Sequence, residues 1–412
     1  MTIHLVVPPH PVLPLVAKAI SLLNAPFRGV DVPQNNYSLS VQAMNNAAFD
    51  DIGIHSRPDK RSEAEDRWVA FQPYLLSKGY QLRPRYQPDW VPSWKGTSIK
   101  PLHCEDSLDS IPIRVLDATR IQDNQQVKLK MIVAYAAGEG ANEYALLKHF
   151  SESPLKDDPS NHVVPCLDSF PIPGIDAGNF VVMPLLSSYQ LIPFYNLAEV
   201  HELLKQLFDG LLFLHSNNVA HRDIASTNVM MDARPLFEEP FHPFYQDHSL
   251  DAKRLIYPSY SRSEKDVRYY FIDYGYAVWF PDPNAPRTAV GVDAREAAPE
   301  QKSGQPYDPF PADVYQLGKM IHDDLFQAVD DLRFLLPLIR GMTEETPTRR
   351  LTLEQARDQM NTSFVGLHGW RYRWPLVPRN TRFQDRCWYF FRGLVAEILF
   401  LVRCIRRLGL RN

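Results

Sequence analysis

The spacing of the apolar residues changes near Leu186, and this change divides the chain into two regions of different structure. Before that point, residues 111–120 and 127–135 are short runs separated by the polar turn QDNQQ, a pattern typical of paired strands. The run NFVVMPLL, residues 179–186, is a buried strand that breaks at Pro184. Leucines then recur at the spacing of one helical face, so we expect an α+β chain.

Several helices carry their own start signals. Asn196 caps a long helix with Glu199 three residues on, and Ser62 with Glu65 forms a capping box further upstream. The long helix has one apolar stripe, made of Val200, Leu203, Leu204, Leu207, Leu211 and Leu214. The earlier helix presents Trp68, Phe71 and Leu75 on one face and ends before Gly79. Two further helices are expected, over 142–150 and 312–324.

Charge and cysteine content exclude some functional classes. The 412 residues carry a net charge of −4, without the basic stripe of a nucleic-acid-binding protein. The four cysteines are scattered, which suggests neither a zinc site nor a disulfide framework. The apolar N-terminal run lacks a positive leading segment and is interrupted by prolines, so secretion is not favoured. We expect an intracellular protein, cytoplasmic or nuclear.

The segment HRDIASTN, His221–Asn228, resembles the catalytic loop His-Arg-Asp-x-x-x-x-Asn of eukaryotic protein kinases. Other kinase landmarks follow the expected order: Val127-Lys128-Leu129-Lys130 in a strand, Glu143 in a helix, Asp273-Tyr274-Gly275 and Ala298-Pro299-Glu300. Within kinases the chain is most similar to divergent fungal protein-kinase-like proteins. It shares with them Leu82–Trp94, Asp117–Arg120 and a long insert from Ala233.

The resemblance implies an ATP- and Mg²⁺-dependent site. In it, Lys130 reaches the α- and β-phosphates and Glu143 holds that lysine. Asp273 and Asn228 hold Mg²⁺, and Asp223 accepts the proton of the substrate hydroxyl. The resemblance further implies nucleotide contacts from Met183 and Leu185, and a bracing pair of Glu300 and Arg350.

The sequence offers an alternative residue for two of these assignments. Lys128 is an alternative to Lys130, because strand alternation puts both lysines on one face. Glu139 is an alternative to Glu143. A surface position is the plain alternative for either glutamate.

The chain also departs from the kinase pattern. Residues 97–137 contain no glycine, although kinases cover the phosphates with a glycine-rich loop. The corresponding loop carries Glu105, Asp106 and Asp109, whose charges would repel a triphosphate unless they point away. Ala225 replaces the lysine of serine/threonine kinases, and Thr227 replaces the arginine of tyrosine kinases.

The resulting prediction is a two-lobed protein-kinase-like fold. Its small lobe has an antiparallel sheet with one key helix, and its larger lobe is mainly helical. The expected parts are an N-terminal extension (1–60), the small lobe with its preceding helix (61–185), the large lobe (186–360, with an insert at about 233–266) and a C-terminal tail (361–412). The insert and the extension are expected outside the core.

The predicted function is transfer of the ATP γ-phosphoryl group to a protein hydroxyl, with serine or threonine as the family default. A pseudokinase that acts as a nucleotide-binding or scaffold module is one alternative, and a small-molecule phosphotransferase is another. Protein substrates are the expected partners. For the apolar, arginine-containing tail, a helix packed on the large lobe is favoured over a membrane-surface or partner-binding helix.

Overall fold

The structure is a computed structural model that describes residues 53, 56–108, 110, 112–133, 140–282, 286–291, 294–367, 369–379 and 381–409. The chain divides into two units, Met1–Ala43 and Met44–Asn412, and everything below concerns the second unit. Most of the extension expected over residues 1–60 lies outside the described residues.

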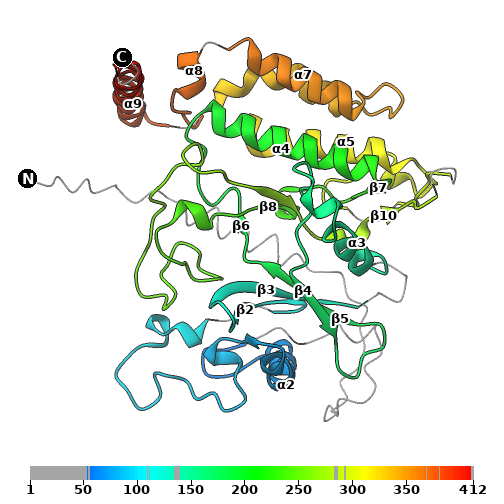
Figure 1. Cartoon of the computed structure of the whole chain (residues 1–412), viewed down its shortest axis with the longest axis vertical. Helices are drawn as coiled ribbons and strands as arrows, with labels where there is room; N and C mark the ends of the chain where they lie inside the picture. Colours follow the sequence, from blue (N-terminus) through cyan, green and yellow to red (C-terminus); the bar gives the residue numbers. More distant parts are fainter. Residues whose placement is uncertain are drawn as a thin grey trace, which may run out of the picture. The chain divides into compact units, whose positions relative to one another are not determined.

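A five-stranded antiparallel sheet and a set of helices make up the described chain, which confirms the α+β class (Figure 1). Across the sheet the strands are β1 (Tyr80–Gln81), β2 (Val115–Arg120), β3 (Gln125–Ile132), β5 (Asn179–Pro184) and β4 (Asp168–Pro171). The predicted polar turn joins β2 to β3, with Arg120 opposite Gln125. β5 ends at the predicted Pro184.

Helix α2 (Glu63–Ser77) packs against this sheet through its aromatic face. The predicted capping box is confirmed, because the Glu65 amide donates to Ser62 Oγ at 3.2 Å and the Ser62 amide donates to Glu65 Oε2 at 2.8 Å. The ring of Trp68 lies 5.9 Å from that of Phe180 on β5, measured between centroids. The helix therefore adds its aromatic side chains to the apolar core of the sheet.

The remaining helices begin with α3, which follows β3, and most lie after the sheet in the sequence. They are α3 (Glu143–Phe150), α4 (Leu197–Ser216), α5 (Pro309–Met320), α6 (Leu336–Met342), α7 (Leu353–Val365), α8 (Gly369–Arg373) and α9 (Phe383–Gly409). The predicted cap of α4 is confirmed, since Asn196 Oδ1 accepts from the Glu199 amide at 3.1 Å. Every residue of its predicted apolar stripe is buried. α5 is extended by a π-helical turn, Ile321–Phe326.

Five short strands lie around the segment that resembles the catalytic loop. They are β6 (Ser187–Ser188), β7 (Val219–Ala220), β8 (Val229–Met231), β9 (Tyr269–Phe271) and β10 (Val278–Trp279). β7 pairs with β10, and β8 pairs with both β6 and β9. Strands β7 and β8 therefore fix the two ends of the loop between them.

The insert at about 233–266 differs from the expectation that it lies outside the core. It has irregular structure, as its proline content predicts, yet Leu236, Phe241 and Ile256 are buried in the main apolar cluster. Arg262 donates to the backbone oxygen of Tyr189 at 2.5 Å and lies over an aromatic ring of the helical part. These buried residues of the insert are therefore part of the core, whereas others, such as Leu255 and Tyr257, are exposed.

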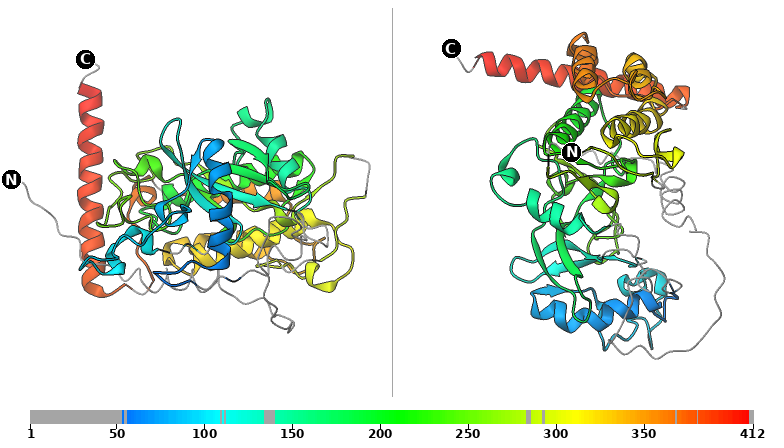
Figure 2. Two further views of the ribbon diagram at one scale, coloured as in Figure 1. Left: turned by 90° about the horizontal axis from the view of Figure 1, so that it is seen from below. Right: turned by 90° about the vertical axis from the view of Figure 1, so that its right-hand side faces the viewer.

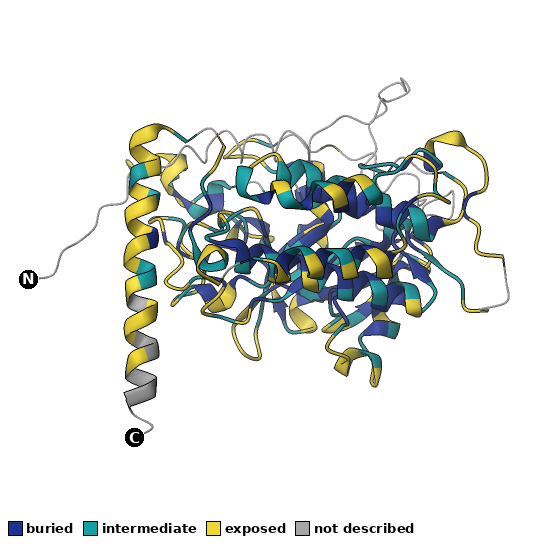
Figure 3. Cartoon of the chain, turned by 90° about the horizontal axis from the view of Figure 1, so that it is seen from above, coloured by how far each residue is buried: buried dark blue, intermediate teal, exposed yellow. Residues whose placement is uncertain are grey.

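The C-terminal tail forms the expected helix but is only partly packed. Figure 2 shows α9 as a straight helix at the edge of the other helices, and Figure 3 shows that much of it is exposed. Glu397 pairs with Arg373 at 2.5 Å, and Phe390 lies against Trp374. Beyond these contacts many of its large apolar side chains are exposed, so the favoured packed arrangement holds on one side of the helix only.

One glycine of α4, Gly210, permits a close approach to a buried histidine. A Cβ atom at Gly210 would lie 2.6 Å from Cβ of His162. His162 is buried, and its Nδ1 lies 2.7 Å from the carbonyl oxygen of Tyr269 on β9. Burial lowers the pKa of His162 from its ordinary 6.5 to about 4, although the hydrogen bond with Tyr269 opposes this shift.

This histidine should make folding stability sensitive to acid. Between pH 6.5 and 4 the unfolded chain takes up a proton that the folded chain excludes. Stability contributed by His162 is therefore complete above pH 6.5 and is lost as the pH falls toward 4. We expect a loss of about 3 kcal/mol over that window, from the size of the shift.

Urea unfolding of the wild type and of His162→Gln at several pH values measures this loss of folding stability in acid. The variant should be less stable at pH 7.5 and should lose less stability between pH 6.5 and 4. Replacement of the exposed His103 by Gln is the control and should leave the wild-type pH dependence unchanged. Equal pH dependence in all three proteins would contradict the assignment.

Candidate functional site

Lys130 is the centre of the site. It lies on β3, and its Nζ is 2.6 Å from Glu143 Oε1 at the start of α3 and 2.8 Å from Asp273 Oδ1. The other lysine of the strand, Lys128, lies 3.8 Å from Asp117 instead. The ion pair expected for one of the two lysines is therefore made by Lys130. The alternative glutamate, Glu139, lies outside the described residues.

The charges of this triad shift one another. The Lys130 ammonium lowers the pKa of Asp273 to about 2, against the opposing effect of burial. Burial raises the pKa of Glu143, and the Asp273 carboxylate adds to that rise while Lys130 opposes it. Burial alone would lower the pKa of Lys130, but the two carboxylates outweigh it and raise that pKa. The lysine therefore stays charged at neutral pH.

The loop His221–Asn228 supplies a second group of polar side chains. Asn228 Nδ2 donates to both the backbone oxygen and Oδ2 of Asp223, each at 2.8 Å. Both side chains are buried. Burial raises the pKa of Asp223, and the charge of Asp273 contributes in the same direction while Arg295 and His221 oppose it.

Asp313 of α5 holds this loop in place. Its two carboxylate oxygens accept the amides of His221 and Arg222 at 2.8 and 2.7 Å. His215 Nε2 lies 2.9 Å from the same carboxylate. Arg222 has a φ of 68°, in the left-handed region that non-glycine residues rarely adopt. The buried carboxylate therefore stabilises a backbone conformation that the loop would not hold by itself.

Asp273 follows β9 and also has a left-handed backbone, with a φ of 65°. The next residue, Tyr274, is buried, and its amide donates to Glu143 Oε1 at 3.2 Å. The Tyr274 ring lies 4.9 Å from that of His221. Tyr274 thus links the Lys130 group to the His221–Asn228 loop.

Arg295 is a part of the site that sequence reasoning missed. Its Nη1 lies 2.8 Å from Asp223 Oδ2 and 3.0 Å from Asn228 Oδ1, and its amide donates to Asp223 Oδ1 at 2.8 Å. Seventy-two residues separate Arg295 from Asp223. One sequence signal pointed to it. Ala225 and Thr227 stand where kinases have a lysine or an arginine, so a cation from another segment could be expected beside Asp223.

Other predicted residues lie around this centre. Met183, near the end of β5, is opposite Lys128 on β3, and Leu185 follows as a buried residue of the main core. Glu300 and Arg350 form the expected ion pair at 2.6 Å, with the arginine side chain fully buried. Among these residues, direct contacts join Lys130 to Glu143 and Asp273, and Asp223 to Asn228.

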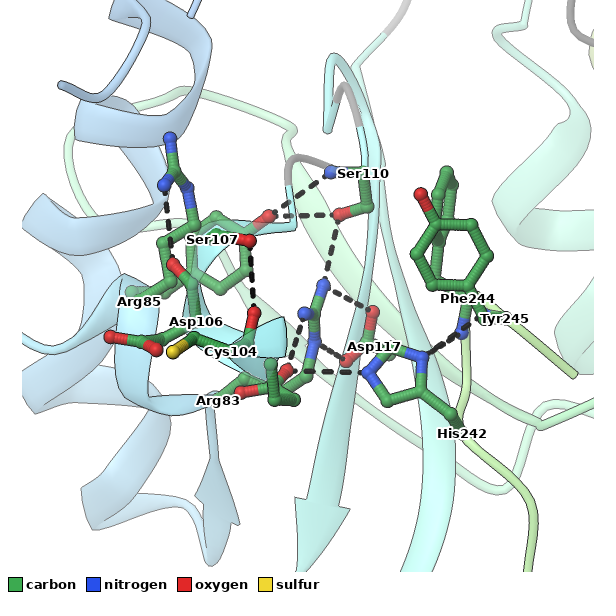
Figure 4. Close-up of polar contacts among 12 residues, drawn as sticks. Arg83, Arg85, Cys104, Asp106, Ser107, Ser110, Asp117, His242, Phe244 and Tyr245 are labelled. Atoms are coloured by element: carbon green, nitrogen blue, oxygen red, sulfur yellow. Dashed lines mark hydrogen bonds and ion pairs between the residues drawn. The ribbon is translucent and has the colours of Figure 1, made fainter. Parts of the chain in front are cut away.

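The acidic loop before β2 points into a polar network of its own (Figure 4). Glu105 pairs with Arg83 at 2.8 Å and lies 3.2 Å from His242 of the insert. Arg83 also pairs with the fully buried Asp117 at 2.6 Å. Asp106 accepts from Ser93 and Trp90, while Asp109 lies outside the described residues. The expected charge repulsion toward a triphosphate is thus reduced for Glu105, because its charge is compensated.

The donor atoms at the centre suit a hard cation held jointly with a ligand. Among the described residues, no three His, Cys, Asp or Glu side chains form a metal-binding group by themselves. Asp273 and Asn228 nevertheless supply a carboxylate and an amide oxygen, the ligand types that Mg²⁺ takes together with phosphate oxygens and water. The residues present therefore fit an ion that also takes oxygen ligands from a bound molecule and from water better than an ion held by protein alone.

No protein-family model matches this chain, and no curated protein matches it in sequence.

Replacing Lys130 with methionine should destabilise the fold at neutral pH. The change leaves Glu143 buried without its cation, and breaking a buried pair costs about 3–5 kcal/mol. Lowering the pH should recover part of this loss, because protonation neutralises the orphaned carboxyl group. Urea unfolding at pH 7.5 and 5.5 measures both effects.

Lys128→Met is the matched control for this experiment. Asp117 keeps its pair with Arg83 in that variant, so we expect a smaller loss without recovery in acid. Equal losses in the two variants would show that the triad has no special role in stability.

Proposed function

We propose that the chain is a protein kinase that transfers the γ-phosphoryl group of Mg²⁺-bound ATP to a protein hydroxyl group. The observation that carries the proposal is the simultaneous pairing of Lys130 with Glu143 and Asp273. These residues come from a strand, a helix and a loop. The resemblance to protein kinases implied the pair of Lys130 with Glu143, and the contact with Asp273 adds to it. A solvated surface charge would have no reason to contact both partners.

Each residue then has one task. Lys130 binds the α- and β-phosphates, and Glu143 keeps it extended. Asp273 and Asn228 hold Mg²⁺, which supplies positive charge against the phosphate oxygens. Asp223 orients the attacking hydroxyl group and accepts its proton, and the upward shift of its pKa favours that acceptance.

The division of the fold into a sheet and a set of helices supports the same proposal. We infer two lobes, with the five-stranded sheet and α3 in the smaller one and α4 to α7 in the larger one. The Glu300–Arg350 pair lies in the larger lobe, near the end of the segment that begins at Asp273. The resemblance of Ala298-Pro299-Glu300 to the Ala-Pro-Glu motif of protein kinases favours a protein substrate over a small molecule.

A pseudokinase is the second candidate, and specific observations favour it. Residues 97–137 lack glycine, and Ala225 leaves the loop without the expected lysine. In addition, Arg295 contacts both oxygens of Asp223 through its amide and guanidinium groups. The pairing of Lys130 with both carboxylates argues for activity, because a scaffold has no chemical need for that arrangement.

Asp223→Asn should lower phosphotransfer by on the order of a hundredfold or more, because asparagine cannot accept the hydroxyl proton. The fold and the binding of Mg²⁺–ATP should change little, since the two side chains have the same size. Labelled ATP with a panel of protein substrates measures transfer, and thermal unfolding with and without Mg²⁺–ATP measures binding.

Two results would count against an active kinase. One is a wild-type protein that binds nucleotide but phosphorylates neither itself nor any protein of the panel. The other is equal activity in the wild type and in Asp223→Asn, which would point to a contaminating kinase. Either would leave the pseudokinase as the better description.

A further inference from the structure

The loop that carries Asp223 has no free cation for a phosphoryl group. Ala225 and Thr227 occupy the positions where a lysine or an arginine is expected. The loop's own Arg222 is engaged elsewhere, because its guanidinium donates to the Tyr307 hydroxyl at 3.0 Å and to the backbone oxygens of Tyr276 and Val290. Charge for the transferred group must therefore come from another segment.

Arg295 meets this need from the segment between Asp273 and Glu300. Its Nη1 lies between Asp223 Oδ2 and Asn228 Oδ1, at 2.8 and 3.0 Å. These atoms belong to the proposed proton acceptor and the proposed Mg²⁺ ligand, so the transferring group must pass beside the guanidinium. The Arg295 side chain is 46% exposed, whereas Asp223 is 4% exposed. The cation can therefore turn toward a ligand while the carboxylate stays fixed.

The backbone around Arg295 is held against the loop, which keeps the side chain near the site. The Arg295 amide donates to Asp223 Oδ1 at 2.8 Å. Gln301 accepts from the Ala298 amide at 2.7 Å and donates to the backbone oxygen of Arg222 at 3.0 Å. These contacts fix the backbone at Arg295 and in the residues that follow it, so the side chain can turn while this backbone stays in place.

We propose that Arg295 is a catalytic residue that binds the γ-phosphoryl group and replaces the cation missing at residues 225 and 227. The inference rests on the proposed kinase function. In the transfer, the substrate hydroxyl oxygen forms a bond to the γ-phosphorus and gives its proton to Asp223. The bond from that phosphorus to the β-bridging oxygen breaks, and ADP leaves with the electron pair. Arg295 balances the charge on the γ-phosphoryl oxygens, as a guanidinium does well.

The rival interpretation is that Arg295 blocks the site. In that case its contacts with Asp223 and Asn228 would compete with Mg²⁺ and with the substrate. The two interpretations predict opposite effects of removing the side chain. Removal lowers the rate if Arg295 binds phosphate, and raises the rate if Arg295 is an inhibitor.

The experiment compares Arg295→Ala, Arg295→Lys and the control Arg287→Ala in the full-length protein. Arg287 lies in the same segment, but its guanidinium contacts Asn218 and the ring of Phe310. Arg295→Ala should lower kcat by on the order of a hundredfold, and lysine should restore part of it. Arg295→Ala should also reduce the preference for Mg²⁺–ATP over Mg²⁺–ADP by about tenfold or more, because only ATP has the γ-phosphate.

The nucleotide preference keeps the test decisive if the wild type transfers no phosphate. Absent transfer would overturn the proposed activity, while the ATP-to-ADP affinity ratio would still decide whether Arg295 meets the γ-phosphate. An unchanged ratio, or a higher rate in Arg295→Ala, would overturn the role of Arg295 and leave an active wild type unaffected. Absence of any nucleotide binding would overturn both.

Helix α9 supports a second inference that does not depend on enzyme activity. One side of the helix meets the rest of the protein, through Phe390 against Trp374 and Arg392 over the ring of Tyr195 at 4.6 Å. The other side carries large apolar residues with half or more of their surface exposed: Trp388, Phe391, Val395, Ile398 and Ile405. Figure 3 shows this exposure along the helix.

The charge of the same segment indicates what covers these apolar residues. Helix α9 contains five arginines, one aspartate and one glutamate, a net charge of +3. That glutamate, Glu397, is paired with Arg373 of α8. A helix with an apolar face and a surplus of arginine matches the surface of a bilayer with anionic headgroups.

Among the residues that the structure describes, no helix is sufficiently long and apolar to span a bilayer. We infer that α9 binds an anionic membrane by lying in its surface, with the face around Phe391 and Ile398 inserted among the lipids.

Sedimentation of the full-length protein with lipid vesicles tests this inference. The wild type should bind vesicles that contain phosphatidylserine more strongly than pure phosphatidylcholine vesicles. Val395→Glu/Ile398→Glu should weaken binding at least tenfold, because buried carboxylates oppose insertion into lipid. The matched control, Ile121→Glu/Val365→Glu, changes two exposed apolar residues outside α9 and should bind as the wild type does.

Circular dichroism and urea unfolding should confirm that both double variants fold. Equal binding to the two kinds of vesicle, or unchanged binding of Val395→Glu/Ile398→Glu, would overturn the inference. So would a dimer in light scattering that dissociates in that variant without any vesicle binding, because a second copy would then cover α9.

Discussion

The packing of strand β3, helix α3 and the loop after β9 depends first on the ammonium group of Lys130, which lies between two carboxylates. Without this ammonium group the carboxylates of Glu143 and Asp273 would repel each other, and burial would oppose the ionisation of Glu143. One cation lowers both costs, so strand β3, helix α3 and the loop after β9 must come together for any of the three charges to be tolerated. The same contact links the sheet to the helical part of the chain.

A second buried carboxylate has a comparable role within the helical part. Asp313 accepts two successive amides of the His221–Asn228 loop and thereby holds Arg222 in a left-handed conformation. A left-handed backbone at a residue other than glycine persists only where several surrounding contacts hold it, and such strained residues are concentrated at functional sites. The resulting turn directs Asp223 toward Asn228 and the guanidinium of Arg222 toward the segment that carries Arg295.

Local features were readable from the sequence because the interactions that set them are local. The caps at Ser62 and Asn196 act within one helical turn, and the stripe on α4 follows from helical spacing. Lys130 was preferred to Lys128 only through the resemblance to the kinase motif, since the two lysines share a strand face and differ in what lies opposite. Arg295 and the Arg83–Asp117 pair were missed because their partners are distant in sequence. The burial of the insert was also missed, because an irregular chain packs aromatics without a periodic signal.

The insert has a mechanical consequence. His242 contacts Glu105 in the long connection between β1 and β2, and Gln246 donates to the backbone oxygen of Leu186 at 3.0 Å, where the chain leaves the sheet. One short stretch of the insert thus contacts both the β1–β2 connection and the segment by which the chain leaves the sheet. A rotation of the sheet against the helices about that stretch would leave these two contacts in place. Such a rotation would instead have to break the contacts of α3 with the loop after β9, among them the hydrogen bond from the Tyr274 amide to Glu143 Oε1.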